Sequence, residues 1–297
     1  MNIASFYQKT VRTLKKSDIK SAEIDARILL ELATGESREF LLAHPEFELS
    51  DKEYHTRLIS VDRRKSVEPI AYITGKKEFF GLEFLVTPDV LIPRPETEML
   101  VEQALEFIKS KVRKVESSLK ILDVGTGSGN IIISIANHWG NLLSIDNKLP
   151  QFTPEFVASD ISGKALKVAR KNAKKHGVEK LVKFVQSDLF DRIDGRFNIM
   201  VANLPYVPKQ KTDDGKRMTE EINFEPRNAI FANDNGTMII KKFLSGAKNH
   251  INGDGLILVE VDPRNARELK NYAGKLYKSV VLKKDFSGIY RVLKILT

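Results

Sequence analysis

Three groups of residues follow apolar, strand-like runs and are suited to binding a small molecule. They are the glycine-rich loop 125–129, the acid Asp160, and the Asn-Leu-Pro-Tyr segment 203–206. Glycine lets the backbone approach a ligand closely, a carboxylate accepts hydrogen bonds from hydroxyl groups, and a side-chain amide both donates and accepts them. These positions predict one ligand site at the carboxyl ends of neighbouring strands.

The glycine-rich loop is followed by the pattern of an apolar helix. Its candidate ligand-binding residues are Gly125, Thr126, Gly127, Ser128 and Gly129. A dinucleotide-binding fingerprint would have glycine at position 130, where asparagine stands, and the loop does not match a Walker phosphate loop. Alternating glycines after an acid-ended strand resemble the S-adenosylmethionine loop of class I methyltransferases. A tight strand-to-helix turn without a ligand is the alternative.

Two acids end the next two strand-like runs. Asp160 is suited to accept hydrogen bonds from the ribose hydroxyls of a cofactor. It lies 31 residues after Gly129, against roughly 20 in the dinucleotide pattern, which indicates an inserted surface loop around residues 140–152. Capping of the helix that starts near Ser162 is the alternative role. Asp188 is the candidate for the adenine end of the cofactor, with a simple turn residue as the alternative.

Asn203 ends the fourth strand, where the strand order of such a sheet reverses and ligands bind. A planar NH₂ nitrogen is a poor nucleophile because its lone pair is delocalised, so a site that methylates it needs acceptors for both N–H bonds. The side-chain oxygen of Asn203 and the carbonyl of Leu204 are two such acceptors, and Pro205 restricts Leu204 to extended conformations. The ring of Tyr206 is then expected to stack on the planar group. An ordinary turn is the alternative.

The composition argues against several other kinds of site. The 297 residues include no cysteine, and the five histidines show no paired spacing, so we expect no disulfide, no cysteine nucleophile and no metal.

No apolar run approaches the roughly 18 residues of a membrane span, and the N-terminus lacks a signal-peptide pattern, so we expect a cytoplasmic protein without a membrane partner. The net charge of +9 comes entirely from residues 96–297, which predicts an acidic partner or a solvated basic surface.

The apolar patterns also predict the elements that position these residues. Residues 1–68 have short amphipathic helix patterns, which indicate a small helical domain without a catalytic group, expected to recognise the substrate. Aromatic and β-branched residues broken by glycine and proline predict a linking hairpin within residues 69–94. From residue 95 to residue 297, strands alternate with helices, the order of a doubly wound parallel α/β sheet. The predicted strands are 120–124, 155–160, 182–188, 197–202, 255–261, 278–284 and 290–296, and the last two are expected to pair antiparallel because no crossover helix fits between them.

Five longer segments resemble one known family. They are EPIAYITGKKEFFGLEFLVTPDVLIPRPETEMLVEQAL, ILDVGTGSGN, DISGKALKVARKNA, NLPYVP and FEPRNAIF. Together they extend over nearly the whole chain and look like the PrmC/HemK family, the glutamine N5-methyltransferases of peptide chain release factors. IPRPETE at residues 92–98 is the most specific part, because adenine methyltransferases with an Asn-x-Pro-Tyr motif are not expected to carry it.

The resemblance implies a Rossmann-like, seven-stranded class I methyltransferase fold with S-adenosyl-L-methionine as donor and S-adenosyl-L-homocysteine as product. The implied acceptor is the glutamine of the Gly-Gly-Gln motif in release factors, and we expect a monomer. The implied cofactor-site residues are Gly125, Gly127, Gly129, Asp160, Asp188, Leu189 and Asn203. The implied glutamine-binding residues are Asn203, Leu204, Pro205 and Tyr206, of which Asn203, Pro205 and Tyr206 are the catalytic candidates. Arg94, Glu96 and Thr97 are expected near the mouth of the site, although Pro95–Glu98 is also an ordinary helix start.

The chain departs from the family pattern at two places that bear on function. Leu204 replaces the proline of Asn-Pro-Pro-Tyr, a variant more familiar from ribosomal RNA adenine dimethyltransferases. The alternative function is therefore an N6-adenine methyltransferase acting on RNA or DNA, which the basic charge of residues 96–297 also favours. Glu260-Val261-Asp262 replaces Glu-Ile-Gly after the fifth strand, and we interpret it as an altered turn. A non-catalytic binding module is disfavoured because Asn203, Pro205 and Tyr206 are all present.

Overall fold

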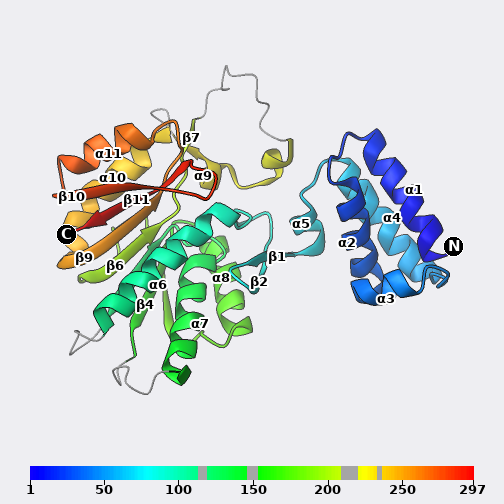
Figure 1. Ribbon diagram of the computed structural model, residues 1–297, viewed down its shortest axis with the longest axis horizontal. Coiled ribbons are helices and arrows are strands. Elements are labelled where there is room, and N and C mark those ends of the chain that lie inside the picture. The colour runs from blue at the N-terminus through cyan, green and yellow to red at the C-terminus, as the bar shows by residue number, and fades with distance from the viewer. Residues whose placement is uncertain (113–118, 146–152, 209–219, 233–235) are drawn as a thin grey trace. The chain divides into compact units, whose positions relative to one another are not determined.

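The computed structural model describes residues 1–112, 119–145, 153–208, 220–232 and 236–297 (Figure 1). The chain divides into two compact units, each with its own core. The first unit is Met1–Lys76 with Arg217–Phe224, and the second is Lys77–Lys216 with Glu225–Thr297. The glycine loop, Asp160 and the Asn-Leu-Pro-Tyr segment all belong to the second unit. In the described part of the chain, no helix combines the length and the apolar character needed to cross a membrane.

The first unit is helical. Its elements are α1 (Ile3–Lys16), α2 (Ala22–Thr34), α3 (Arg38–Ala43), α4 (Asp51–Lys65), α5 (Ile70–Thr74) and the 3₁₀ turn Glu220–Phe224. The amphipathic faces of α1 and α2 bury large apolar side chains against each other, among them Phe6, Leu14 and Leu29. Asn2 and Ser37 cap α1 and α3 by accepting a hydrogen bond from a backbone N–H of the first turn. The predicted helical character of residues 1–68 is therefore confirmed.

A buried ion pair joins three parts of the first unit. Arg64 on α4 donates to Asp25 on α2 at 2.7 Å and to Glu221 in the 3₁₀ turn at 2.7 Å. The side chains of Arg64 and Asp25 are only 4% and 3% exposed. A buried charge without its partner is strongly destabilising, so these residues tie the helices of this unit to one another.

The segment predicted as a linking hairpin contains both a helix and a hairpin. Ile70–Thr74 forms α5, which buries Ala71, Tyr72 and Ile73 and ends at Gly75 with a φ of 72°. β1 (Lys76–Phe79) and β2 (Leu82–Leu85) then form the two-stranded sheet. The hairpin thus occupies the middle of the segment and follows a short helix, because β-branched and aromatic residues indicate burial as much as they indicate strand geometry.

The second unit contains the predicted seven-stranded sheet. Its strands are β3 (Lys120–Val124), β4 (Glu155–Asp160), β5 (Val182–Gln186), β6 (Phe197–Ala202), β9 (Ile251–Glu260), β10 (Ser279–Lys284) and β11 (Tyr290–Leu296). They are ordered β10-β11-β9-β6-β3-β4-β5, and β3, β4, β5, β6 and β9 are parallel. β11 pairs antiparallel with both β9 and β10, as expected for the short connection between the last two strands.

Helices cover both faces of this sheet (Figure 1). They are α6 (Glu98–Val112), α7 (Asn130–Ile145), α8 (Gly163–Lys175), α10 (Met238–His250) and α11 (Ala266–Gly274). The short α9 (Arg227–Ile230) precedes β8 (Phe231–Ala232), which pairs with β7 (Val207–Pro208) in a separate two-stranded sheet. α7 continues to Ile145, so residues 140–145 of the predicted inserted loop are helical. The rest of that predicted loop, residues 146–152, lies outside the described residues.

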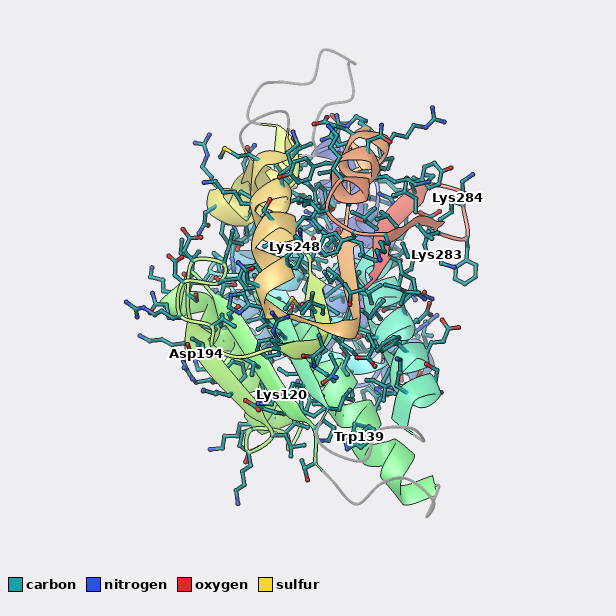
Figure 2. The ribbon with its side chains drawn as sticks, turned by 90° about the vertical axis from the view of Figure 1, so that its left-hand side faces the viewer. Lys120, Trp139, Asp194, Lys248, Lys283 and Lys284 are labelled. Carbon is teal, nitrogen blue, oxygen red and sulfur yellow. The ribbon has the colours of Figure 1, made fainter. Side chains whose placement is uncertain are left out.

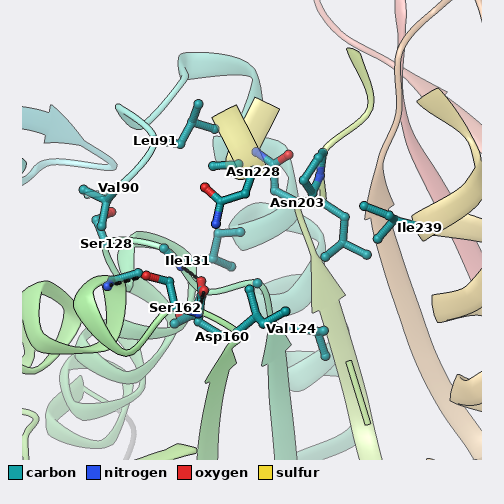
Figure 3. Close-up of a pocket in the computed structure, with 18 of the residues that line it drawn as sticks. Val90, Leu91, Val124, Ser128, Ile131, Asp160, Ser162, Asn203, Asn228 and Ile239 are labelled. Carbon is teal, nitrogen blue, oxygen red and sulfur yellow. Dashed lines mark hydrogen bonds between the residues drawn. The ribbon is translucent and has the colours of Figure 1, made fainter. Parts of the chain in front are cut away.

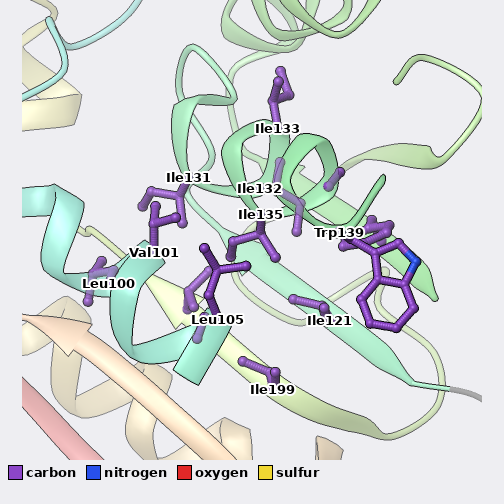
Figure 4. Close-up of a cluster of buried hydrophobic side chains, with 14 of the residues drawn as sticks. Leu100, Val101, Leu105, Ile121, Ile131, Ile132, Ile133, Ile135, Trp139 and Ile199 are labelled. Atoms are coloured by element: carbon purple, nitrogen blue, oxygen red, sulfur yellow. The ribbon is translucent and has the colours of Figure 1, made fainter. Parts of the chain in front are cut away.

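Alternate residues of the central strands supply two separate cores. Ile121 and Ile199 face the cluster formed with α6 and α7, which also contains Trp139 (Figure 4). Leu122 and Met200, the next residue in each strand, face the cluster formed with α10 and α11. Because both faces of these strands are buried, their sequences are continuous apolar runs. Charged side chains, such as Lys248 on α10 and Lys283 on β10, lie on the outside of the unit (Figure 2).

Candidate active site

A cavity of about 750 Å³ lies at the carboxyl ends of β3, β4 and β6. The chain runs from β3 outward to β5 and then returns to the other side of β3 as β6, so the order of the strands reverses between β3 and β6. Ligands bind at this reversal in open α/β sheets. Figure 3 shows Ser128 and Asp160 on one side of the cavity and Asn203 and Ile239 on the other.

The strand register places the glycine loop beside Asn203. Val124 lies opposite Ala202 in the parallel pair of β3 and β6. The residues that follow these two strands, Gly125 and Asn203, are therefore neighbours. Gly125, Gly127 and Gly129 have φ values of 75°, 56° and 82°. A Cβ on Gly127, which lines the cavity, would meet no atom within 4 Å. The loop therefore leaves open space beside its backbone, as required for a ligand in close contact with it.

Asp160 holds the glycine loop and also faces the cavity. Its Oδ2 accepts a hydrogen bond from the Gly127 N–H at 2.9 Å, and its Oδ1 accepts one from the Ser162 N–H at 2.8 Å. Burial raises the pKa of Asp160, and these two hydrogen bonds oppose that rise. Each carboxylate oxygen has a second lone pair, so Asp160 can still accept hydrogen bonds from ligand hydroxyls. The cap of α8 is Ser162, whose Oγ accepts from the Ala165 N–H.

Asp123, at the end of β3, is a buried acid that the sequence analysis did not select. Its carboxyl group is fully buried, and its Oδ2 accepts a hydrogen bond from the Thr126 hydroxyl at 2.7 Å. Its Oδ1 has no hydrogen-bond partner among the described residues. Burial raises the pKa of Asp123 to about 7, and the negative charge of Asp160 adds to this effect. The available signal was its position, because it ends an apolar strand directly before the loop.

Asn203 is the first member of a chain of side-chain hydrogen bonds that we name the Glu260 network. The Asn203 amide donates to the Thr97 hydroxyl at 3.0 Å, and Thr97 donates to Glu260 Oε2 at 2.6 Å. The Tyr206 hydroxyl donates to the other carboxylate oxygen, Oε1, at 3.0 Å. Burial raises the pKa values of Glu260 and Tyr206. These four residues come from three separate segments, which the network holds together.

The segment that carries Thr97 is anchored by a second buried acid. Glu225 is 4% exposed and accepts hydrogen bonds from the Ile92 N–H at 3.2 Å and from the Arg94 guanidinium at 2.5 Å. Glu96 points to Arg291, at 3.5 Å. Three of the five residues that precede Thr97 are thus held by contacts with Glu225 or Arg291.

Most of the residues predicted from the sequence lie together at the cavity. Those that line it are Arg94, Thr97, Gly125, Thr126, Gly127, Ser128, Asp160, Asp188, Leu189, Asn203, Leu204 and Pro205. The residues that do not line it are Gly129, Glu96 and Tyr206. A Cβ on Gly129 would meet Ile133 and Ala169, which identifies Gly129 as a packing position. Tyr206 does not line the cavity, and its hydroxyl donates to Glu260, so stacking of its ring on a ligand stays a prediction.

The structure also adds residues to the site. Glu260 does not line the cavity but connects Thr97 with Tyr206, and it ends an apolar strand as Asp160 does. That shared position was the signal in the sequence, which the interpretation as an altered turn missed. Further lining residues that the sequence analysis did not select as candidates are Asp89, Val90, Leu91, Asn130, Asn228 and Ile239.

Two sequence families match the chain. Residues 6–75 match the family described as the PrmC N-terminal domain, and residues 115–277 match the one described as a methyltransferase domain. The second match includes more than half of the chain and contains the glycine loop, Asp160 and Asn203.

Named relatives and a solved structure resemble the chain over much of its length. The release factor glutamine methyltransferase of Haemophilus influenzae is 32% identical, over 98% of this chain and 98% of its own. The protein of the same name from Buchnera aphidicola is 36% identical, over 88% of this chain and 85% of its own. The catalytic domain of hMettl16, solved in complex with MAT2A 3'UTR hairpin 6, has a TM-score of 0.55 and 14% identity, over 83% of this chain and 82% of that one. At 14% identity, the likeness to the hMettl16 catalytic domain shows a shared fold only.

Proposed function

Because the chain belongs to the release factor glutamine methyltransferase family, we propose that its cavity binds S-adenosyl-L-methionine together with the glutamine of the Gly-Gly-Gln motif in a peptide chain release factor. The second unit has the Rossmann-like class I methyltransferase fold predicted from the sequence, and it carries the methyltransferase domain. The observation that supports the site most directly is the position of Asn203, on the same cavity as the glycine loop and Asp160.

The residues of the cavity fit the proposed methyl donor. The space beside Gly127 and the acceptor oxygens of Asp160 suit a ligand that has both a chain in close contact with the loop backbone and sugar hydroxyls. A volume of about 750 Å³ is within the range of pockets that enclose small molecules of this size. Asp188 and Leu189 line the same cavity and are proposed to contact the adenine end. When bound, S-adenosyl-L-methionine supplies an electrophilic methyl group on its sulfonium centre.

Asn203 and Leu204 are proposed to hold the acceptor nitrogen. An amide NH₂ has two N–H bonds, and the Asn203 side-chain oxygen and the Leu204 backbone carbonyl can accept one each. Both residues line the cavity. Fixing the nitrogen in one orientation removes much of the entropic barrier to its attack, and no covalent intermediate with the protein is required. Pro205 follows directly and restricts the conformation of Leu204, which aims this carbonyl.

Tyr206 is proposed to support this site from outside the cavity. Its hydroxyl is bound to Glu260, and its ring packs with the apolar cluster between the sheet and α10. In this arrangement Tyr206 stabilises the position of the Asn-Leu-Pro-Tyr segment. The first unit, which carries no residue of the cavity, is proposed to recognise the protein substrate.

Methylation of adenine is the alternative that the replacement of proline by Leu204 raised. It is not favoured, because the full-length relatives are named as glutamine methyltransferases of release factors. The side chain of Leu204 is 5% exposed and packs with the apolar cluster near α10, so the replacement leaves its backbone carbonyl available to the acceptor.

The test is methylation of a release factor by the purified protein. Mass spectrometry after incubation with S-adenosyl-L-methionine should find one added methyl group on the glutamine of the Gly-Gly-Gln motif. A release factor with Gln→Ala at that position is the matched control and should remain unmodified. Methyl-adenine in a parallel RNA reaction, with an unmodified release factor, would overturn the proposal.

A further inference from the structure

We propose that Glu260 determines which end of the Asn203 amide faces the cavity, acting through the hydroxyl of Thr97. Glu260 is a positioning residue in this proposal, because it does not line the cavity itself. The catalytic consequence rests on the proposed function, since it concerns the orientation of the group that accepts a hydrogen bond from the substrate amide.

The first step is the state of Glu260. It ends β9 and is 2% exposed, and in the part of the chain that the structure describes it forms no ion pair with a lysine or arginine. The positive charge of Arg291 acts on Glu260, but its guanidinium contacts Asp285 and Glu96 instead. Glu260 is held by two hydroxyl groups, one on each carboxylate oxygen. In both bonds the hydroxyl donates and the carboxylate oxygen accepts, so Thr97 and Tyr206 are both donors.

The second step follows from the single hydrogen of a hydroxyl group. Thr97 uses its hydrogen in the bond to Glu260 at 2.6 Å, so toward Asn203 its oxygen can only accept. The group of Asn203 that meets Thr97, at 3.0 Å, must then be the NH₂. The Asn203 oxygen is directed away from Thr97, and it accepts no hydrogen bond from the described residues. That oxygen is therefore the group available to a ligand.

The third step is the effect of reversing the hydrogen bond between Asn203 and Thr97, so that Thr97 donates and Asn203 accepts. If the Thr97 hydrogen were free to point at Asn203, the amide could turn and present its NH₂ to the cavity. Two NH₂ groups facing each other are both donors, and a buried donor without an acceptor is costly. Glu260 thus favours binding of a substrate amide through its N–H bonds, while Tyr206 secures the second carboxylate oxygen.

Removing the hydroxyl of Thr97 tests the network without a large change in volume. In Thr97→Val we expect kcat for the release factor to fall at least about tenfold, because the amide loses its fixed orientation, with Kd for S-adenosyl-L-homocysteine changed less than about twofold. Thr97→Ser keeps a hydroxyl and should recover most of the lost kcat. Thr10→Val is the matched control, since Thr10 on α1 is also buried but is not one of the lining residues.

Glu260→Met tests the carboxylate itself. Methionine is similar in size and leaves no buried charge, so the fold should be retained while Thr97 loses its acceptor. We expect the same fall in kcat as in Thr97→Val. Wild-type kcat in both variants would overturn the proposal.

A double-mutant cycle separates positioning through Asn203 from a general structural role. If Thr97 acts only through the Asn203 amide, Thr97→Val should not lower kcat further in a protein that already carries Asn203→Ala. Effects that multiply in the double variant would contradict the proposal.

The orientation of Asn203 can also be measured without methyl transfer. In protein with ¹⁵N-labelled asparagine, the side-chain NH₂ signal of Asn203 is assigned by its loss in Asn203→Ala. The signal should shift in Thr97→Val and Glu260→Met and remain unchanged in Thr10→Val. An unchanged signal in both network variants would overturn the proposal, whereas a shifted signal in a protein that methylates no release factor would show that only the proposed function had failed.

Discussion

Asn203 and Asp160 lie on different walls of the cavity and have different hydrogen-bonding capacities (Figure 3). An amide can present either a donor or an acceptor, and its neighbour Thr97 decides between them. A carboxylate accepts through both oxygens, and Asp160 uses them for the Gly127 and Ser162 N–H groups as well as for the cavity. Each residue therefore has a different expected effect when it is replaced.

Replacement of Asn203 should affect turnover rather than cofactor binding. Asn203→Ala removes one of the two acceptors proposed for the reacting amide, so we expect kcat to fall by about two orders of magnitude, or roughly 2.7 kcal/mol of transition-state stabilisation. Calorimetry with S-adenosyl-L-homocysteine and single-turnover rates on the same preparation measure the two effects. Turnover at the wild-type rate would remove Asn203 from the mechanism.

Asp123 predicts a dependence of stability on pH. Burial raises its pKa from the usual 3.8 to about 7, so between these values the folded protein keeps a proton that the unfolded chain releases. The stabilisation from this proton is complete below the unfolded pKa and is lost as the pH rises through the folded pKa. Asp123→Asn cannot ionise, so its Tm relative to wild type should increase from about pH 4 to about pH 7 and then level off. A constant difference in Tm across this range would show that Asp123 does not titrate there.

At the scale of elements, the site depends on close contact between the backbone at Gly236 and the backbone of the Asn-Leu-Pro-Tyr segment. Gly236, after α9 and before α10, has a φ of 90°, and a Cβ at this position would lie 1.9 Å from the Tyr206 carbonyl oxygen. No side chain other than hydrogen fits there. The connection to α10 therefore holds the backbone of the Asn-Leu-Pro-Tyr segment in place.

Gly236→Ala should consequently displace the segment that carries Asn203. We expect kcat/KM for the release factor to fall at least about tenfold, because small displacements of positioned groups are costly to catalysis. Gly253→Ala is the control, since a Cβ there would meet no atom within 4 Å. Equal activities of the two variants would show that the contact between Gly236 and Tyr206 does not position the site.

At the scale of the whole molecule, recognition and chemistry are assigned to different units. Among the residues that the structure describes, all those that line the cavity belong to the second unit. A protein that starts at Lys77 should therefore still bind S-adenosyl-L-homocysteine and methylate a short Gly-Gly-Gln peptide. Its kcat/KM for an intact release factor should be at least about tenfold lower, because recognition of the folded substrate is lost. Full activity on the intact release factor would show that the first unit is dispensable.

A full-length variant gives the same test without truncation. Arg64→Met leaves Asp25 buried without its ion-pair partner, which costs about 3–5 kcal/mol in the first unit. Limited proteolysis should then cut within residues 1–76 before it cuts the second unit. Cofactor binding should be unchanged, and activity on the intact release factor should fall as in the truncated protein.

Several features of this molecule could be predicted because they depend on neighbours along the chain. The continuous apolar runs predicted the strands of the second unit, because a strand covered on both faces by helices needs apolar residues at every position. The position of Asp160 and Asn203 after such runs predicted that they meet, because parallel strands bring their carboxyl ends to one edge. The motif resemblance supplied the expected cofactor and acceptor.

Other features arise from contacts between residues that are distant in the sequence. Thr97 and Glu260 are 163 positions apart, and Asn203 and Thr97 are 106 apart. No local pattern indicates that a hydroxyl is a donor to one of these groups and an acceptor from the other. The motif of Tyr206 likewise gives no sign that its hydroxyl donates to Glu260, which is 54 positions away. The direction of a hydrogen bond depends on all the groups that surround it, and those groups are known only once the chain has folded.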